Sequence, residues 1–360
     1  MNIVKILKRV KPHFSYNNKI IFSKYNEIFE YENGHNKKTL LKLKGSWLEK
    51  LFFKSKLLSR LFRLDIRSST IYKNYFFFSY RKKIYSYHVV TKNILQEHKF
   101  RKGRGPISFT EIDNLKGFSN SIVFGEYYSN SKRDKIHIYK RNNDCRWDII
   151  YTFEKGLINH IHAIITDKFR DCLWVLAGDL DHSASIWMIK DNFEFVKRIA
   201  HGDQIYRSCY AYPVKEGLIY ATDTQFSENS IRLLRINEIE TISEELYKIN
   251  GSCINACELR DYLVFSTSTE PNFSYNNKLM MYLDNRPGNG IKANKSDIVV
   301  YHKTEKVFEV IGSLKKDCLP YGLFGLGTIM FPNNMKDMNK IYAFSSGSKI
   351  YDQDTLIIKI

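Results

Sequence analysis

Short stretches in which apolar and polar residues alternate recur along the whole chain. The clearest example places His160 and His162 between apolar neighbours. A period of two is typical of a β-strand and puts both imidazoles on one face of it. Residues 168–171 then predict a turn, and the nearly continuous apolar run 172–177 predicts a strand that is buried on both faces.

The same order of four predicted strands recurs along the chain. Four clear sets lie within 107–153, 160–199, 204–249 and 252–311, two weaker sets near 69–100 and 320–360, and an incomplete one near 19–43. A repeated four-strand unit is typical of a β-propeller, whereas a sandwich has no such unit. We therefore predict an all-β, six-bladed β-propeller, with seven blades as the alternative. It forms a single domain, residues 1–360, and its N- and C-terminal strands close the ring.

One segment departs from the strand pattern. Ser46 and Glu49 have the spacing of a helix capping box, and the apolar residues that follow recur at helical intervals. These features predict an inserted amphipathic helix near 46–63. Its apolar side chains are expected to pack on the outside of the sheets, namely Leu51, Leu58, Leu61 and Phe62. The alternative is that this helix contacts a membrane surface.

The net charge of the chain bears on which type of binding partner we expect. The chain has 56 Lys and Arg against 38 Asp and Glu, which gives a formal net charge of +18. Such an excess favours an anionic partner, although the basic residues are spread along the chain rather than clustered. No RNA-binding motif or basic–aromatic strip is found, so nucleic acid is not the expected partner.

The N-terminal sequence has no apolar core of a secretory signal, and no segment reaches the roughly 20 apolar residues that span a membrane. The six cysteines show no disulfide or zinc spacing. We expect a reduced, cytoplasmic protein, with membrane contact through 46–63 as an open alternative.

Polar residues gather at corresponding ends of the predicted strands. Because successive strands of a blade are antiparallel, the starts of innermost strands and the ends of second strands share one face. The starts carry His160, His162, Gln204 and Arg207, the ends carry Glu126, Asp179 and Asp223, and Asp181 lies in a loop on the same face. We expect these residues to converge on one binding site.

Two other interpretations of these residues stay open. Asp179 and Asp223 can close turns, and the histidines can bond backbone carbonyls. His160 and His162 have the spacing of metal ligands, but the sequence offers no obvious third ligand, so no metal site is predicted. Cofactors stay unknown at this stage.

Five stretches resemble sialidase-like, BNR-repeat (Asp-box) β-propeller proteins, which are often encoded in bacterial surface-polysaccharide gene clusters. They are FGEYYSN (124–130), HIHA (160–163), LWVLAGD (173–179), QIYR (204–207) and YATDT (220–224). The resemblance is best over 105–235 and implies a six-bladed propeller with a carbohydrate ligand. The Asp-box itself is degraded: only Asn142 and Trp147 survive in one copy, and Asp191 in another.

The resemblance implies a carbohydrate-active or carbohydrate-binding propeller for an acidic bacterial surface glycan or its precursor. A sialidase needs three arginines, an acid and a Tyr–Glu pair, and the arginine triad is missing here. A glycosidase could use two of the four acids Glu126, Asp179, Asp181 and Asp223. A polysaccharide lyase could use a histidine base with Arg207. The alternative is a non-catalytic glycan-binding or protein-scaffolding propeller. The candidate catalytic residues are Glu126, Tyr127, His160, His162 and Arg207, and the candidate substrate-binding residues are Asp179, Asp181, Gln204 and Asp223.

Overall fold

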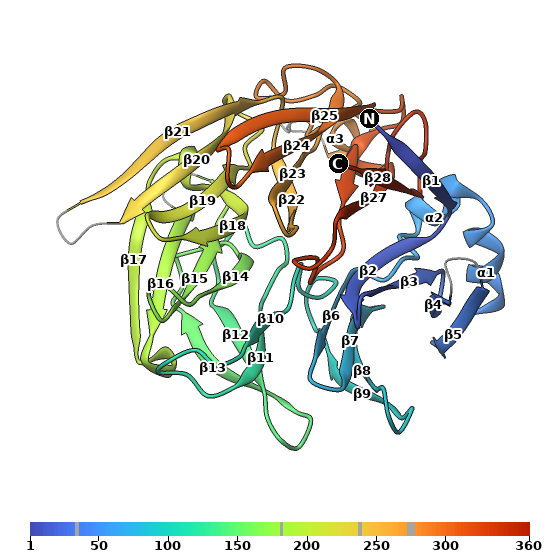
Figure 1. Ribbon diagram of the computed structural model, residues 1–360, viewed down its shortest axis with the longest axis horizontal. Coiled ribbons are helices and arrows are strands. Elements are labelled where there is room, and N and C mark those ends of the chain that lie inside the picture. Colours follow the sequence, from blue (N-terminus) through green and yellow to red (C-terminus); the bar gives the residue numbers. More distant parts are fainter. Residues whose placement is uncertain (33–35, 181–182, 237–239, 272–277) are drawn as a thin grey trace. The chain divides into compact units, whose positions relative to one another are not determined.

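The computed structural model describes residues 1–32, 36–180, 183–236, 240–271 and 278–360. Its strands form seven sheets, each of four strands (Figure 1). Six sheets consist of four consecutive strands, and one joins β1 to β28, β27 and β26. The chain divides into two compact units, one of Met1–Ile66, Thr224–Asn229 and Ile249–Ile360, the other of Arg67–Asp223 and Ser230–Lys248.

The first unit contains three sheets. They are β2 (Lys11–Tyr16), β3 (Lys19–Lys24), β4 (Glu27–Glu32) and β5 (Asn36–Lys42); β22 (Cys253–Glu258), β23 (Tyr262–Thr267), β24 (Lys295–His302) and β25 (Val307–Lys315); and β1 (Ile3–Lys8), β28 (Asp354–Lys359), β27 (Lys340–Ser346) and β26 (Thr328–Met330). It also contains the helices α1 (Trp47–Phe53), α2 (Lys56–Leu61), α3 (Lys278–Leu283) and α4 (Tyr321–Phe324).

The second unit contains four sheets. They are β6 (Ser68–Tyr72), β7 (Tyr75–Tyr80), β8 (Lys83–His88) and β9 (Ile94–Lys99); β10 (Thr110–Ile112), β11 (Ser121–Gly125), β12 (Ile136–Arg141) and β13 (Trp147–Phe153); β14 (Ile161–Asp167), β15 (Cys172–Ala177), β16 (Ser185–Lys190) and β17 (Phe195–His201); and β18 (Ser208–Val214), β19 (Gly217–Thr222), β20 (Asn229–Ile236) and β21 (Thr241–Ile249). Among its described residues, the 3-10 turn η2 (Asp191–Phe193) lies between β16 and β17, and η3 (Gln204–Tyr206) lies between β17 and β18.

The core of the second unit lies where second strands pack against neighbouring sheets. Every residue of β15 is buried, which confirms the strand with two covered faces that the apolar run 172–177 predicts. Trp174 from β15 and Tyr220 from β19 are fully buried in one apolar cluster. These buried strands hold their polar ends in fixed positions.

The prediction of six sheets is wrong, and the alternative of seven is correct. Residues 11–42 form a complete sheet of their own, and only β1 pairs with the C-terminal strands, with Lys8 opposite Asp354. Figure 1 shows β1 alongside β28. The outer strand β5 has no buried residue, so its sequence lacks the apolar alternation by which the other sets are recognised.

The predicted helix near 46–63 is two short helices. Ser46 and Glu49 form the expected capping box of α1, but Ser55 caps a second helix, α2. Leu51 and Phe62 are each 51% exposed, so their predicted packing on the sheets is wrong.

Leu58 and Leu61 are half-buried. The side of α2 that packs against the rest of the first unit is polar. There Arg60 is buried, pairs with Asp317 and donates from Nε to the carbonyl of Phe324 at 2.8 Å. Among the described residues, no helix combines the length and apolar character needed to traverse a bilayer.

Candidate functional site

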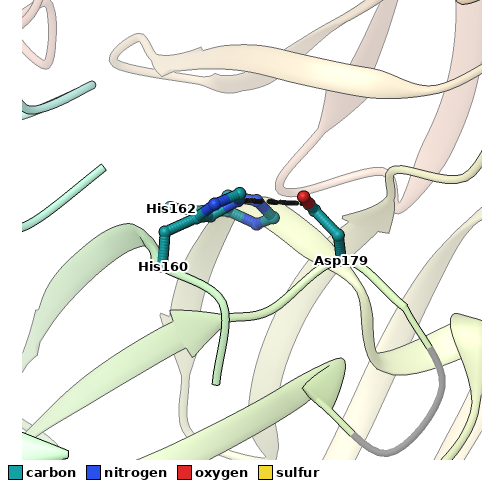
Figure 2. A group of neighbouring side chains, drawn as sticks. All are labelled: His160, His162 and Asp179. Atoms are coloured by element: carbon teal, nitrogen blue, oxygen red, sulfur yellow. Dashed lines mark hydrogen bonds and ion pairs between the residues drawn. The ribbon is translucent and has the colours of Figure 1, made fainter. Parts of the chain in front are cut away.

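Two histidines of the second unit face each other at the start of β14. His160 directly precedes the strand, and His162 occupies a bulge, since the register to β15 shifts between Ile161 and Ala163. The Nε2 atoms of the two imidazoles are 2.9 Å apart (Figure 2). They therefore lie on one side of the chain, as the period of two predicts.

The third member of the group is Asp179, which follows β15. Its Oδ1 lies 3.2 Å from Nε2 of His160 and 3.1 Å from Nε2 of His162 (Figure 2). The other ring nitrogens contact backbone carbonyls: Nδ1 of His160 is 3.1 Å from the oxygen of Tyr128, and Nδ1 of His162 is 2.9 Å from that of Ser208.

Burial and charge act in opposite directions on these groups. Burial alone raises the pKa of Asp179, but the contacts with both imidazoles outweigh it and hold that pKa well below its usual range. Asp179 is therefore a carboxylate at neutral pH. Burial lowers the pKa of His160, and its contact with Asp179 opposes this only in part. The group is thus an anion beside a histidine that resists protonation.

Arg207 connects Asp179 to a second carboxylate. Its Nη2 lies 3.5 Å from Oδ1 of Asp179 and 3.6 Å from Oδ2 of Asp223, at the end of β19. Cys209 donates its thiol to the same Oδ2 of Asp223 at 3.1 Å. Gln204 donates from Nε2 to the backbone carbonyl of Asp179 at 3.1 Å. Gln204 lies in η3 rather than in the strand predicted there, which begins at Ser208.

An aromatic side chain covers the histidines. The ring of Tyr127 lies 4.3 Å from that of His160, centroid to centroid, and the guanidinium of Arg67 lies 5.1 Å from the Tyr127 ring. Burial, with Asp179 as the next cause, raises the pKa of Tyr127 far above its ordinary value. The sequence patterns did not single out Arg67 and Cys209. Arg67 carries no signal, whereas the position of Cys209 two residues after Arg207 could have indicated it.

Two predicted site residues are not brought into this group. Glu126 accepts from the backbone N–H of His137 at 3.0 Å and from the hydroxyl of Tyr139 at 3.4 Å. Its carboxylate therefore does not pair with Tyr127 as the sialidase-like interpretation expects. Burial raises the pKa of Glu126. Asp181 lies outside the described residues.

Within the part of the chain that the structure describes, two sets of side chains could hold a metal ion. One is His160, His162 and Asp179, and the other is His162, Cys209 and Asp223; within each set the ligand atoms lie within 4.8 Å of one another. The third possible ligand, which the sequence pattern did not reveal, is thus Asp179, and it follows the next strand of the same sheet.

The chain was compared with known proteins. No protein-family model matches it, and no curated protein matches it. Solved structures do. The β-propeller domain of Myceliophteria thermophila Cps50 (Swd1) is 8% identical with a TM-score of 0.55, and the match covers 100% of this chain and 99% of that one.

The AfRom2 CNH domain is 8% identical, with a TM-score of 0.52 and coverage of 100% and 96%. A chain of the mitotic checkpoint complex is 7% identical, with a TM-score of 0.54 and coverage of 99% and 94%. At such identities the likeness shows the fold alone. With seven four-stranded sheets, that fold is a seven-bladed β-propeller.

Proposed function

We propose that the group around Arg207 in the second unit binds an acidic carbohydrate or its precursor. The carrying observation is a pair of buried acceptors beside this arginine. Oε1 of Gln204 and Oδ1 of Asp223 have no hydrogen-bond donor within the described part of the chain. Buried acceptors are nearly always paired, and sugar hydroxyls are donors of suitable size.

Arg207 supplies a positive charge for the carboxylate of an acidic sugar, although Asp179 and Asp223 lie close to the same guanidinium. Nη2 of Arg207 stands 3.5 Å from Asp179 and 3.6 Å from Asp223, longer than the about 2.7–2.9 Å of a strong charge-assisted hydrogen bond. A ligand carboxylate that approached Nη2 of Arg207 more closely would make a stronger contact than either of these two.

The same geometry favours binding over catalysis. A glycosidase needs an acid with a raised pKa beside the substrate, but the pKa of Asp179 is lowered, and Glu126, whose pKa is raised, bonds His137 and Tyr139 instead of joining this group. A lyase needs an accessible base, but the side chains of His160 and His162 are only 5% and 2% exposed, and the raised pKa of Tyr127 makes it a poor base. We therefore propose a binding propeller rather than a hydrolase or a lyase.

The test is an array of uronate- and sialate-containing oligosaccharides, probed with the labelled full-length chain. Binding is expected to acidic glycans and not to the same glycans after reduction of their carboxylates. Arg207→Gln should abolish this binding. The matched control is Arg235→Gln, which removes an arginine that pairs with Glu244 on the exposed side of β20.

Equal binding by Arg207→Gln and the parent chain, or no preference for acidic over neutral glycans, contradicts this proposal. The second result would leave the protein-scaffolding alternative as the better account.

A second candidate role concerns residues 46–63. Five apolar side chains of this segment are more than two-fifths exposed: Trp47, Leu48, Leu51, Leu57 and Phe62. Lys50, Lys54 and Arg63 are exposed beside them. This combination supports peripheral contact with an anionic lipid surface.

Vesicle co-sedimentation tests this role. Binding is expected to vesicles that contain phosphatidylserine and not to phosphatidylcholine alone, and Leu51→Glu with Phe62→Glu should remove it. Binding that is unchanged in the double variant contradicts the role of this segment. The matched control is Ile149→Glu with Phe195→Glu, two exposed apolar residues of the second unit.

A further inference from the structure

We infer that His160, His162 and Asp179 form a binding site for one divalent transition-metal ion, with Zn²⁺ as the best-fitting ion. This inference does not depend on the proposed glycan binding. It rests on the orientation of the two imidazoles, on the distances among three ligand atoms and on the chemistry of those atoms.

The backbone determines which ring nitrogens carry hydrogen. A carbonyl oxygen only accepts, so Nδ1 of each histidine must be the donor to it: His160 to Tyr128 at 3.1 Å and His162 to Ser208 at 2.9 Å. In the neutral rings, Nε2 therefore presents a lone pair. Metal-binding histidines typically have this arrangement, with the second nitrogen donating to a carbonyl that orients the ring.

Three lone-pair atoms then point at one another. Nε2 of His160 and Nε2 of His162 are 2.9 Å apart, and Oδ1 of Asp179 lies 3.2 and 3.1 Å from them. Such atoms repel unless a positive charge lies among them. A zinc ion with ligand bonds of about 2.0–2.1 Å separates its tetrahedral ligands by about 3.3 Å, so a small outward shift of these atoms accommodates it.

The ligand types indicate which ion fits. Two imidazoles and one carboxylate suit Zn²⁺, Co²⁺ or Fe²⁺, whereas Mg²⁺ and Ca²⁺ prefer sets made of oxygen alone. Arg207 weakens the attraction for a cation, but Asp223 at 3.6 Å offsets its charge. Three protein ligands leave a fourth position for water or a ligand atom, as in catalytic zinc sites.

The test begins with the full-length chain, freed of metal with a chelator and titrated calorimetrically with ZnCl₂. We expect one equivalent to bind, and no comparable binding of MgCl₂. His162→Gln and Asp179→Asn should each weaken zinc binding by at least about 100-fold, because loss of a direct ligand exceeds the about 10–100-fold effect of a supporting residue. His88→Ala, which alters a histidine bonded to Thr91, is the control and should bind zinc normally.

X-ray absorption on the zinc-loaded parent chain tests the ligands without any variant. The expected first shell contains only nitrogen and oxygen near about 2.0 Å. Sulfur at about 2.3 Å would assign the ion to Cys209 and overturn this ligand set. The inference is also overturned if the parent chain binds no zinc, as when a proton shared by the two imidazoles takes the ion's place, or if folded variants bind it with parental affinity.

Discussion

Two histidines occupy the same kind of position in different sheets and have different surroundings. His13 lies at a bulge in β2, where the register to β3 shifts between Pro12 and Phe14, just as His162 lies at the bulge in β14. Both side chains are buried. Nε2 of His13 is 2.7 Å from the hydroxyl of Ser23, whereas Nε2 of His162 faces a second imidazole and a carboxylate.

The residue two positions earlier makes the difference. In β2 it is Lys11, whose ammonium donates to Asp65 at 2.6 Å, and in the β14 sheet it is His160. Burial, with the charge of Lys11 as the next cause, lowers the pKa of His13 to about 3. In both sheets the histidine at the bulge is buried, so the bulge alone does not determine its role. Its neighbours then decide whether it is a structural residue or a candidate ligand.

The largest expected effect is the acid sensitivity that His13 confers. Since the folded chain keeps His13 neutral while the unfolded chain protonates it near pH 6.5, the unfolded state binds more protons between about pH 6.5 and pH 3. Stability is present above that range and falls as the pH drops through it, by about 1.4 kcal/mol per pH unit, or of the order of 5 kcal/mol in total.

Urea unfolding at several pH values measures this contribution. His13→Gln can keep a hydrogen bond to Ser23 but cannot titrate, so its free energy of unfolding should fall less steeply with acid. Parallel curves for the two proteins would refute the assignment.

The next effect is a gain in stability on zinc binding, which should depend on His162 and not on His13. Zinc at about 100 times its Kd should raise the free energy of unfolding by about 2.7 kcal/mol in the parent chain. His13→Gln should retain this gain, and His162→Gln should lose it. Thermal unfolding with and without zinc gives both values. A loss of the gain in His13→Gln would remove the contrast between the two bulges.

A smaller effect concerns the hydroxyl partner of His13. Ser23→Ala leaves the buried imidazole without that contact and should cost about 1–3 kcal/mol. Zinc affinity, measured by the same titration as above, should not change. A cost within the error of the unfolding measurement would mean that the contact with Ser23 contributes nothing.

The smallest effect is expected for the ion pair beside His13. The side chain of Asp65 is 40% exposed, so its pairing with Lys11 is screened by water, and Asp65→Asn should cost less than about 1 kcal/mol. Chemical unfolding at neutral pH checks this value. A loss as large as that of Ser23→Ala would show that Lys11 depends on Asp65 to stay buried.

Local patterns predicted what depends on local geometry. The period of two placed His160 and His162 on one side, and the apolar run of β15 indicated a buried strand. The number of sheets was missed, because the outer strand β5 has no buried residue and because β1 alone, through long-range pairing with β28, completes the C-terminal sheet. The direction of Glu126 was missed because neighbouring residues of an extended chain point to opposite sides, and here Tyr127 rather than Glu126 approaches the histidines.

The pairing of β1 with β28 has a consequence for how the protein is made. The amide of Arg9 donates to the carboxylate of Asp354 across 345 residues of chain. The six sheets of consecutive strands can form in the order in which the ribosome releases them. The sheet that contains β1 can be completed only after β28 has been synthesised. A nascent chain that stalls earlier leaves β1 with an unpaired edge and exposes Leu7, which is buried in the complete protein. We therefore expect incomplete translation products to aggregate or to be degraded by proteases.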